Sequence, residues 1–286
     1  MSIWEDQITL NSRNDASFET LAPAHEWRAS DGHPTNWGAE LRGLDASLAR
    51  DTHPLPTTQD REGYFGPHHF SYWASGLRDL QNLEACAARL DAPTGTYLDL
   101  GCASGRVLRH AALESPTRRV IGCDINRRHV DWVTSYLPES ILAFQNTSIP
   151  TLPLADASID VVTAYSVFTH IEAIETTWLM ELFRILRPGG FAWVTVHTQD
   201  TWTDMTPDWP LFSALKNHPD FPEDQNASPL DGERVVFRWK NDRSYSSNVF
   251  YTWEYMRRVW GRIFDVVEEH RRLPVFQDVV VLRKPH

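Results

Sequence analysis

Near its middle the chain reads Leu98-Asp99-Leu100-Gly101-Cys102-Ala103-Ser104-Gly105-Arg106, and this stretch decides the fold that we predict. The apolar residues that enter it predict a buried strand, and the spacing of the apolar residues after it predicts a helix over 104–114. Small residues at 101, 103 and 105 let the backbone turn sharply and let a ligand approach main-chain atoms. The amides that open the following helix favour an anionic group in that turn. The stretch therefore predicts a strand, a ligand-binding turn and a helix in immediate succession.

Strand and helix patterns alternate on both sides of this turn. The predicted strands are 97–100, 120–124, 141–144, 159–165 and 191–196, and the predicted helices are 104–114, 127–137 and 176–186. Further on, 250–260 has the pattern of a helix, and 263–267 and 278–282 have that of two strands too close together for a helical crossover. We therefore expect an α/β fold: a Rossmann-like, doubly wound, mostly parallel seven-stranded sheet with an antiparallel C-terminal hairpin at its edge.

Two segments lie outside this alternation. Residues 1 to about 70 are rich in Pro, Gly, Asn, Asp and His, so we expect residues 1–75 to form a loosely structured arm or lid. Residues 76–286 then form the main domain, with an insertion at about 198–248 that is rich in Trp and Pro. Insertions of this length are usually binding lids, and we expect one for the substrate. Its tryptophans would line an acceptor pocket or fill a core beneath the loop.

An acidic residue completes the first binding signal. Asp124 ends the second strand, 23 residues after Gly101, where a carboxylate can accept the hydroxyls of an adenosine ribose. A nucleoside-binding α/β protein of any kind would fit this pair. The spacing Asp-x-Gly-x-Ala-x-Gly differs from the Gly-x-Gly-x-x-Gly of dinucleotide-binding proteins, which disfavours a nicotinamide dehydrogenase.

Two later motifs follow in order: Leu152-Pro153-Leu154-Ala155-Asp156 before the fourth strand, and Leu186-Arg187-Pro188-Gly189-Gly190 before the fifth. With these the chain resembles the class I S-adenosylmethionine-dependent methyltransferases, over roughly residues 94–198 and 250–284. The resemblance implies that the chain is an enzyme and that S-adenosyl-L-methionine is its cofactor.

The same resemblance assigns roles to the positions that match. The turn residues Gly101, Cys102, Ala103 and Gly105 would contact the amino-acid half of the cofactor, and Asp99 would hold the turn or bind the amino group. Asp124 would bind the ribose, Ile125 would cover the adenine, and one of Asn146, Thr147 and Ser148 would replace the family's usual acid at the adenine. Tyr165 and Ser166 would lie near the sulfonium. Ala103 stands where the family usually has Gly, a mild departure because a methyl group is small.

The catalytic candidates are His197, His170 and Tyr165, all close to the carboxyl ends of strands. A hydroxyl acceptor would need a base to take its proton, and His197 is equally well placed for that role and for a binding contact. His170 is better explained by packing of the turn that follows it.

Composition narrows the function further. A net charge of −11 disfavours a nucleic-acid partner, and no apolar run is long enough to cross a membrane. The amino-terminal sequence carries acids where a secretory signal has basic residues, so a cytoplasmic location is the simplest expectation. The three cysteines are best explained as buried packing residues, and His68-His69 lacks acidic partners at ligand spacing, so we expect no metal.

These observations together predict transfer of a methyl group to a small molecule, with an oxygen of a metabolite or sugar-like compound as acceptor. Transfer to nitrogen or sulfur, and a non-catalytic module that binds S-adenosylmethionine, are the alternatives. The pattern does not distinguish a monomer from a homodimer.

Overall fold

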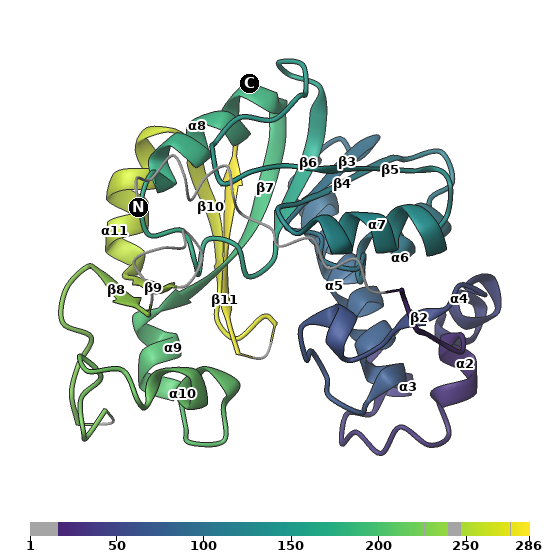
Figure 1. Ribbon diagram of the computed structural model, residues 1–286. Helices are drawn as coiled ribbons and strands as arrows, with labels where there is room; N and C mark the ends of the chain where they lie inside the picture. Colours follow the sequence, from purple (N-terminus) through teal and green to yellow (C-terminus); the bar gives the residue numbers. More distant parts are fainter. Residues whose placement is uncertain (1–16, 226, 240–246, 275) are drawn as a thin grey trace. The chain divides into compact units, whose positions relative to one another are not determined.

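A computed structural model of the chain describes residues 17–225, 227–239, 247–274 and 276–286 (Figure 1). The described residues divide into two compact units, one within 17–146 and the other within 147–286. We call them the N-terminal unit and the C-terminal unit and describe each by itself.

The N-terminal unit carries the first half of the predicted alternation. Its elements are, in chain order, β1 (Thr20–Leu21), α2 (Ala24–Trp27), α3 (Trp37–Glu40), α4 (Leu44–Arg50), β2 (Leu55–Pro56), the 3₁₀ turn η1 (Gln59–Arg61), α5 (His69–Arg89), β3 (Thr96–Leu100), α6 (Leu108–Glu114), β4 (Arg119–Asp124), α7 (Arg127–Tyr136) and β5 (Ile141–Gln145). β4 pairs in parallel with both β3 and β5, with Leu100 opposite Cys123 and Cys123 opposite Phe144. The carboxyl ends of the three strands therefore meet at one edge, while α6 and α7 lie beside β4 and β5 (Figure 1).

The described part of the N-terminal arm is folded, and the prediction that it is loosely structured was wrong. Four helices and two short strands lie within residues 20–89. They enclose a hydrophobic core of Ala24, Trp37, Leu41, Leu44, Leu48, Leu55, Phe70, Trp73, Ala74 and Leu77. The elements are so short that Pro and Gly at their boundaries hide the helical period, because a four-residue helix offers only one turn to read.

A buried ion pair fastens this arm to α6. Arg109 is 0 % exposed and Asp51 1 %, and the guanidinium donates to both Asp51 oxygens, at 2.6 Å and 3.0 Å. Arg109 also donates to the carbonyls of His53 and Pro54, and the indole of Trp73 donates to Asp51 at 2.7 Å. Both charges are thus paired and hydrogen-bonded, which is the condition under which burying them is tolerated.

The C-terminal unit carries the second half of the alternation. Its elements are β6 (Ile159–Ala164), α8 (Glu175–Ile185), β7 (Leu186–Thr198), α9 (Gln199–Asp204), α10 (Pro210–Leu215), β8 (Arg234–Arg238), β9 (Ser247–Tyr251), α11 (Trp253–Val259), the 3₁₀ turn η2 (Trp260–Arg262), β10 (Asp265–His270) and β11 (Asp278–Arg283). β6 pairs in parallel with β7, and β11 runs antiparallel to both β7 and β10. The predicted C-terminal hairpin is confirmed.

The insertion contains two strands that the sequence analysis missed. β8 and β9 form an antiparallel pair, and β9 joins the end of β7 in parallel, with His197 opposite Phe250. The predicted helix therefore begins later than Phe250, because Thr252 caps it by accepting the amide of Tyr255 at 3.1 Å.

The aromatic residues of the insertion form a core of their own. Its buried members are Trp202, Met205, Trp209, Leu211, Leu215, Phe237 and Phe250. Trp202 stacks on Phe237 with ring centroids 5.8 Å apart. Trp202 and Trp209 therefore fill a core beneath the loop, which is one of the two roles expected for the tryptophans of the insertion.

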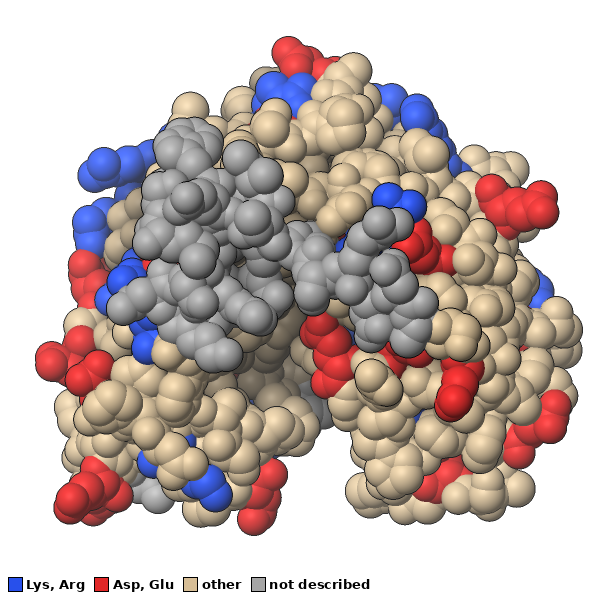
Figure 2. Space-filling view, in the orientation of Figure 1, with Lys and Arg blue, Asp and Glu red and all other residues tan. Residues whose placement is uncertain are grey.

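The distribution of charged side chains and the composition of the helices bear on the partners that the sequence analysis considered. On the face shown in Figure 2, lysines and arginines are scattered among acidic side chains instead of forming one patch. Within the described ranges, no helix has the length and apolar character of a membrane span. Nor do these ranges contain a group of three or more His, Cys, Asp or Glu side chains arranged to hold a metal ion.

Candidate functional site

The glycine-rich turn is held to β4 by its first two amides. Gly101 and Cys102 both donate to the carbonyl of Cys123, at 2.8 Å and 3.0 Å. Gly101, Ala103 and Gly105 all have positive φ, of 73°, 46° and 78°. The small residues at alternate positions are thus needed because the backbone enters the left-handed region three times within five residues.

The energetic cost of having Ala103 in place of Gly comes from its backbone conformation, whereas the sequence analysis considered only the size of its methyl group. At φ 46° a Cβ atom is unfavourable by about 1 kcal/mol compared with glycine, whatever space surrounds it. The Ala103 amide donates to Asp124 Oδ2 at 2.8 Å, and this bond to a charged acceptor offsets the strain.

Gly105 is required by packing as well as by conformation. A Cβ atom there would lie 2.4 Å from Cδ1 of Leu137 and 3.2 Å from Cγ2 of Val133. Gly76 of α5 has a similar role, because its Cβ would lie 2.1 Å from the carbonyl oxygen of Arg106. The turn is therefore enclosed by α5 and by the end of α7, and it has little freedom to change shape.

Asp124 lies beside this turn with a defined acceptor capacity. Its side chain is nearly buried, and Oδ1 accepts the amide of Asn126 at 2.8 Å while Oδ2 accepts that of Ala103. A carboxylate oxygen can accept two hydrogen bonds, so each oxygen has one backbone donor and capacity for another. Two adjacent acceptor positions suit the two neighbouring hydroxyls of a ribose.

His129 and Glu62 extend this acidic centre, and sequence reasoning missed both. His129 Nδ1 lies 3.4 Å from Asp124 Oδ1, and its Nε2 lies 3.7 Å from Glu62 Oε1. Burial lowers the pKa of His129, but the carboxylates of Asp124, Glu62 and Asp60 outweigh it, so the net pKa is raised. His129 thus lies in contact with Asp124, within a group of three carboxylates. The sequence Asp-Ile-Asn-x-x-His does not by itself indicate that His129 contacts Asp124, because the contact exists only once α7 has folded back against the end of β4.

The adenine candidates fall in different units. Asn146 is buried, and its amide donates to the Asp124 carbonyl at 3.1 Å, while half-buried Ile125 accepts the side chain of Gln145 at 3.1 Å. Thr147 and Ser148 belong to the C-terminal unit, where the Thr147 hydroxyl accepts the Ile149 amide at 3.3 Å. Among the three polar candidates, Asn146 is the one placed beside Asp124.

The remaining turn candidates are buried. Asp99 is 2 % exposed within β3, and Cys102 is 4 % exposed. All three cysteines are free and buried, and burial raises the pKa of the Cys102 thiol well above its ordinary value. Cys102 is therefore a packing residue and not a nucleophile.

In the C-terminal unit, a chain of polar contacts joins the ends of β6, β7 and β11. Ser166, at φ 57°, follows half-buried Tyr165 and donates its amide to the Thr195 hydroxyl at 2.7 Å. Gln277 donates its side-chain amide to the Ser166 hydroxyl at 2.9 Å. Its nitrogen is also 3.5 Å from Nε2 of His197. Gln277 was missed because it lies in the hairpin turn, 80 residues beyond His197.

His197 is neutral in this setting. The ring is 4 % exposed, and its Nδ1 has no hydrogen-bond partner among the described residues. Burial, together with the neighbouring His170, lowers the pKa of His197 to about 3. A histidine this acidic takes up a proton poorly at neutral pH, so its position favours a hydrogen-bonding contact over the role of general base.

His170 has a structural partner. Its Nδ1 lies 2.7 Å from the carbonyl of Ser247 at the start of β9, so it donates there. Burial lowers its pKa, and it too is neutral. This contact agrees with the packing interpretation of His170.

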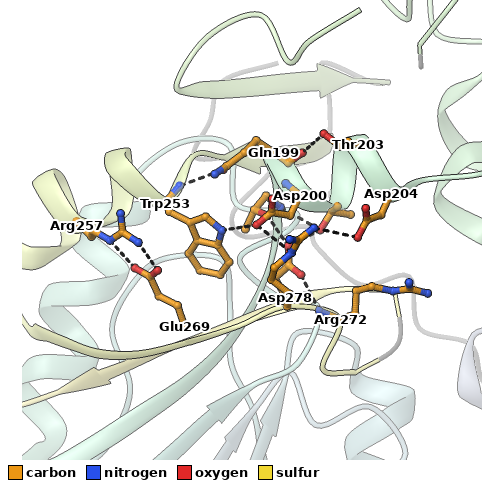
Figure 3. Close-up of polar contacts among 12 residues, drawn as sticks. Gln199, Asp200, Thr203, Asp204, Trp253, Arg257, Glu269, Arg272 and Asp278 are labelled. Atoms are coloured by element: carbon orange, nitrogen blue, oxygen red, sulfur yellow. Dashed lines mark hydrogen bonds and ion pairs between the residues drawn. The ribbon is translucent and has the colours of Figure 1, made fainter. Parts of the chain in front are cut away.

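A second network fixes the segments that carry His197 and Gln277 (Figure 3). Asp278 is fully buried and accepts the hydroxyls of Thr198 and Thr201 and the amide of Arg272. Asp200 accepts the indole of Trp253 at 2.7 Å. The end of β7, the start of α9 and the hairpin turn are therefore tied together within this unit.

The His68-His69 pair is also accounted for inside the arm. His68 Nδ1 lies 2.5 Å from the Asp31 carbonyl, and His69 Nδ1 lies 2.8 Å from Nη2 of Arg61. Each ring has a protein partner.

Comparison with known proteins agrees with this geometry. Residues 98–194 match a family described as a methyltransferase domain. The chain is 32 % identical over 149 residues to a probable S-adenosylmethionine-dependent methyltransferase of Mycolicibacterium smegmatis, covering 52 % of this chain and 51 % of that protein. It is 38 % identical over 126 residues to an uncharacterized 37.1 kDa transposon protein of Streptomyces fradiae, covering 42 % of this chain and 35 % of that one. The chain thus spans about half or less of the length of these relatives.

Solved structures support the fold. A putative S-adenosylmethionine-dependent methyltransferase of Listeria monocytogenes superposes with a TM-score of 0.51 at 14 % identity, covering 74 % of this chain and all of that one (100 %). This likeness confirms the predicted Rossmann-like α/β fold with its mostly parallel sheet. Motifs, fold and matched domain together show a methyltransferase domain over residues 98–194, in a chain that is similar to S-adenosylmethionine-dependent methyltransferases.

Proposed function

We propose that this protein transfers a methyl group from S-adenosylmethionine to a hydroxyl oxygen of a small-molecule acceptor, such as a metabolite or sugar-like compound. The observation that supports cofactor binding most directly is the Asp124 carboxylate, with spare acceptor capacity on both oxygens beside a turn that its own hydrogen bond stabilises. The residues present fit the nucleoside: two acceptors suit a ribose diol, and half-buried Ile125 and buried Asn146 adjoin them.

Methyl transfer requires little covalent chemistry from the protein itself. S-adenosylmethionine supplies a sulfonium methyl that is already activated for transfer, so alignment of the acceptor and exclusion of water are the main requirements. We assign the cofactor to Gly101, Cys102, Ala103, Asp124 and Asn146, with Asp99 supporting the turn. Gly105 contributes by keeping the turn closed against α7.

The acceptor is assigned to the polar residues at the ends of β6 and β7. The hydroxyl of Ser166, the amide of Gln277 and the ring of His197 lie in contact, so they can bind a polar acceptor group. In this proposal neutral His197 accepts a hydrogen bond from the acceptor hydroxyl and orients an oxygen lone pair for attack. The oxygen gains the methyl group as the bond from that methyl to sulfur breaks, and the hydroxyl proton then passes to solvent water. Tyr165 stays a candidate for contact near the methyl group.

The two segments outside the alternation are assigned to enclosure of the site. We propose that residues 1–75 act as a lid for the cofactor and that the insertion at about 198–248 acts as a lid for the acceptor. Each has a hydrophobic core of its own, so each would cover its ligand as a folded body.

Methylation of a nitrogen is the second candidate function, because a neutral amine attacks without first losing a proton. The low pKa of His197, about 3, is compatible with an acceptor that needs no base. A thiol acceptor and non-catalytic binding of the cofactor complete the alternatives.

One assay separates these possibilities. The protein is incubated with methyl-labelled S-adenosylmethionine and three panels of small molecules that carry hydroxyl, amine or thiol groups. We expect labelled product from the hydroxyl panel, and product from the amine or thiol panel alone would contradict the choice of oxygen. Binding of S-adenosylhomocysteine without turnover on any panel would favour the non-catalytic module, and failure to bind it would contradict the proposal altogether.

A further inference from the structure

Arg61 is a buried cation that forms no ion pair with a described residue, although the charge of Asp31 acts on it from a greater distance. Its side chain ends η1 and is 2 % exposed. Nη2 contacts the Gly66 carbonyl at 2.5 Å, Nδ1 of His69 at 2.8 Å and the Thr58 hydroxyl at 3.4 Å. Nε and Nη1 are buried and have no hydrogen-bond partner in the described ranges. Three N–H groups of one guanidinium are therefore unsatisfied.

Arg109, which is also buried in this unit, has the anionic partner that Arg61 lacks. Arg109 binds both oxygens of Asp51 and two carbonyls. Arg61 makes no ion pair within the described chain, although an unpaired buried charge is strongly unfavourable. Such a group is expected where a ligand supplies the missing anion.

The position of Arg61 indicates which ligand this is. Its guanidinium carbon lies 4.8 Å from the centre of the Tyr72 ring, and the Tyr72 hydroxyl bonds the side chain of Ser104 in the glycine-rich turn. The Ser104 hydroxyl in turn donates to the carbonyl of Asp60, the residue before Arg61. Arg61 is thus held beside the turn, and all these residues lie in the N-terminal unit.

We propose that Arg61 binds the α-carboxylate of the amino-acid portion of S-adenosylmethionine. The inference rests on the proposed function and deepens it, since it assigns the arm a direct part in cofactor recognition. A carboxylate accepts strong hydrogen bonds from a guanidinium, and it would supply the acceptors that Nε and Nη1 lack. Asp124 then holds the ribose while Arg61 holds the other end of the cofactor.

The test compares two nucleosides that differ at the carboxylate. S-adenosylhomocysteine has the amino-acid portion, and 5′-methylthioadenosine lacks it. Calorimetric titration of Arg61→Met should show affinity for S-adenosylhomocysteine reduced by roughly tenfold to hundredfold, the range for hydrogen bonds to charged groups. Affinity for 5′-methylthioadenosine should stay within about twofold of that of the unsubstituted protein, since this nucleoside has no carboxylate for Arg61 to bind.

Two further variants keep the result interpretable. Arg61→Lys retains the charge and should lose less affinity for S-adenosylhomocysteine than Arg61→Met. Arg28→Met removes an arm arginine whose ion pair with Asp45 is exposed, and it should bind both nucleosides normally.

Each other outcome overturns the proposal in a recognisable way. Equal loss for both nucleosides, with a lower thermal midpoint, would assign Arg61 a structural role. Unchanged binding of both would place the carboxylate elsewhere, and lost acceptor affinity with unchanged cofactor binding would assign Arg61 to an anionic acceptor. If the unsubstituted protein bound neither nucleoside, the proposed function would fail together with this inference.

Discussion

The carboxylate of Asp124 accepts the backbone amide of Ala103 at 2.8 Å, so the acidic strand end and the glycine-rich turn form one hydrogen-bonded unit. The turn enters the left-handed region at Ala103, a conformation that costs energy for a residue with a Cβ atom. A single side chain thus supports the strained turn, and it is the same side chain to which we assign the ribose.

Asp124→Asn should weaken binding of the nucleoside, because it removes acceptors on which both roles of the carboxylate depend. One side-chain oxygen would become an NH₂ group, which cannot accept the Ala103 or Asn126 amide and cannot accept a ribose hydroxyl. We expect a loss of S-adenosylhomocysteine affinity of roughly tenfold to hundredfold by calorimetry. An unchanged affinity would show that the nucleoside binds elsewhere. Asp131→Asn, at an exposed pair with Arg127, is the matched control.

Gly105→Ala should destabilise the protein more than the same change at another glycine of similar conformation. A methyl group at 105 adds overlap with Leu137 to the cost of positive φ, for a total of about 2–4 kcal/mol. Gly32, at φ +65°, has nothing within 4 Å of its Cβ position, so Gly32→Ala should cost only about 1 kcal/mol. Urea unfolding of both variants measures the difference. Equal losses would mean that α7 yields to the added methyl group.

The buried pair of Asp51 and Arg109 should make the arm sensitive to acid. Burial raises the pKa of Asp51, but Arg109 and His53 lower it by more, and the net value is well below the ordinary range. A carboxyl group with a depressed folded-state pKa contributes stability above its unfolded pKa, near 3.8, and that stability is lost as the pH falls further.

Asp51→Asn should therefore lower stability by about 3–5 kcal/mol at pH 7, because it leaves Arg109 buried without its counter-charge. The loss should become smaller as the pH falls below 4, which urea unfolding at several pH values would reveal. Arg127→Ala breaks an exposed pair and should cost less than about 1 kcal/mol. A constant difference between the Asp51 variant and the parent across pH would contradict the assigned ionisation.

His197→Ala should impair use of the acceptor and leave cofactor affinity unchanged. Since the pKa of His197 is lowered to about 3, the ring does not titrate near neutrality. We expect kcat of the parent enzyme to show no inflection from His197 between about pH 6 and 8, and the variant to raise KM for the acceptor. An inflection near the ordinary histidine pKa of about 6.5 that disappears in the variant would restore the general-base role.

The same shift has a consequence for stability. A histidine whose folded-state pKa is depressed stabilises the fold at pH above its unfolded pKa of about 6.5, and this contribution declines as the pH falls toward 3. The parent should lose more stability than His197→Ala between pH 6.5 and 4.5. Parallel curves in thermal unfolding would contradict the buried neutral state.

The parts of the site that could be predicted from sequence are those set by local chemistry. Gly101, Gly105 and Asp124 were identified because a strand, a tight turn and a helix leave a signature within a few residues. The hairpin of β10 and β11 was likewise visible, since a short connection excludes a helical crossover.

The parts that were missed depend on tertiary contacts. η1 and α7 place Arg61 near Tyr72 and His129 beside Asp124, and nothing in their neighbouring residues indicates these positions. β8 and β9 were not predicted because Trp and Pro dominate the insertion and because their pairing depends on the end of β7. The folded arm escaped prediction because its core joins residues as far apart as Ala24 and Leu77.

Binding of the nucleoside by Asp124 and the glycine-rich turn is tested directly by a crystal structure of the complex with S-adenosylhomocysteine. We predict that both ribose hydroxyls lie within hydrogen-bonding distance, about 3 Å, of the Asp124 oxygens, with the amino-acid portion against residues 101–105. A nucleoside bound away from Asp124, or a turn closed to any ligand, would contradict the central claim.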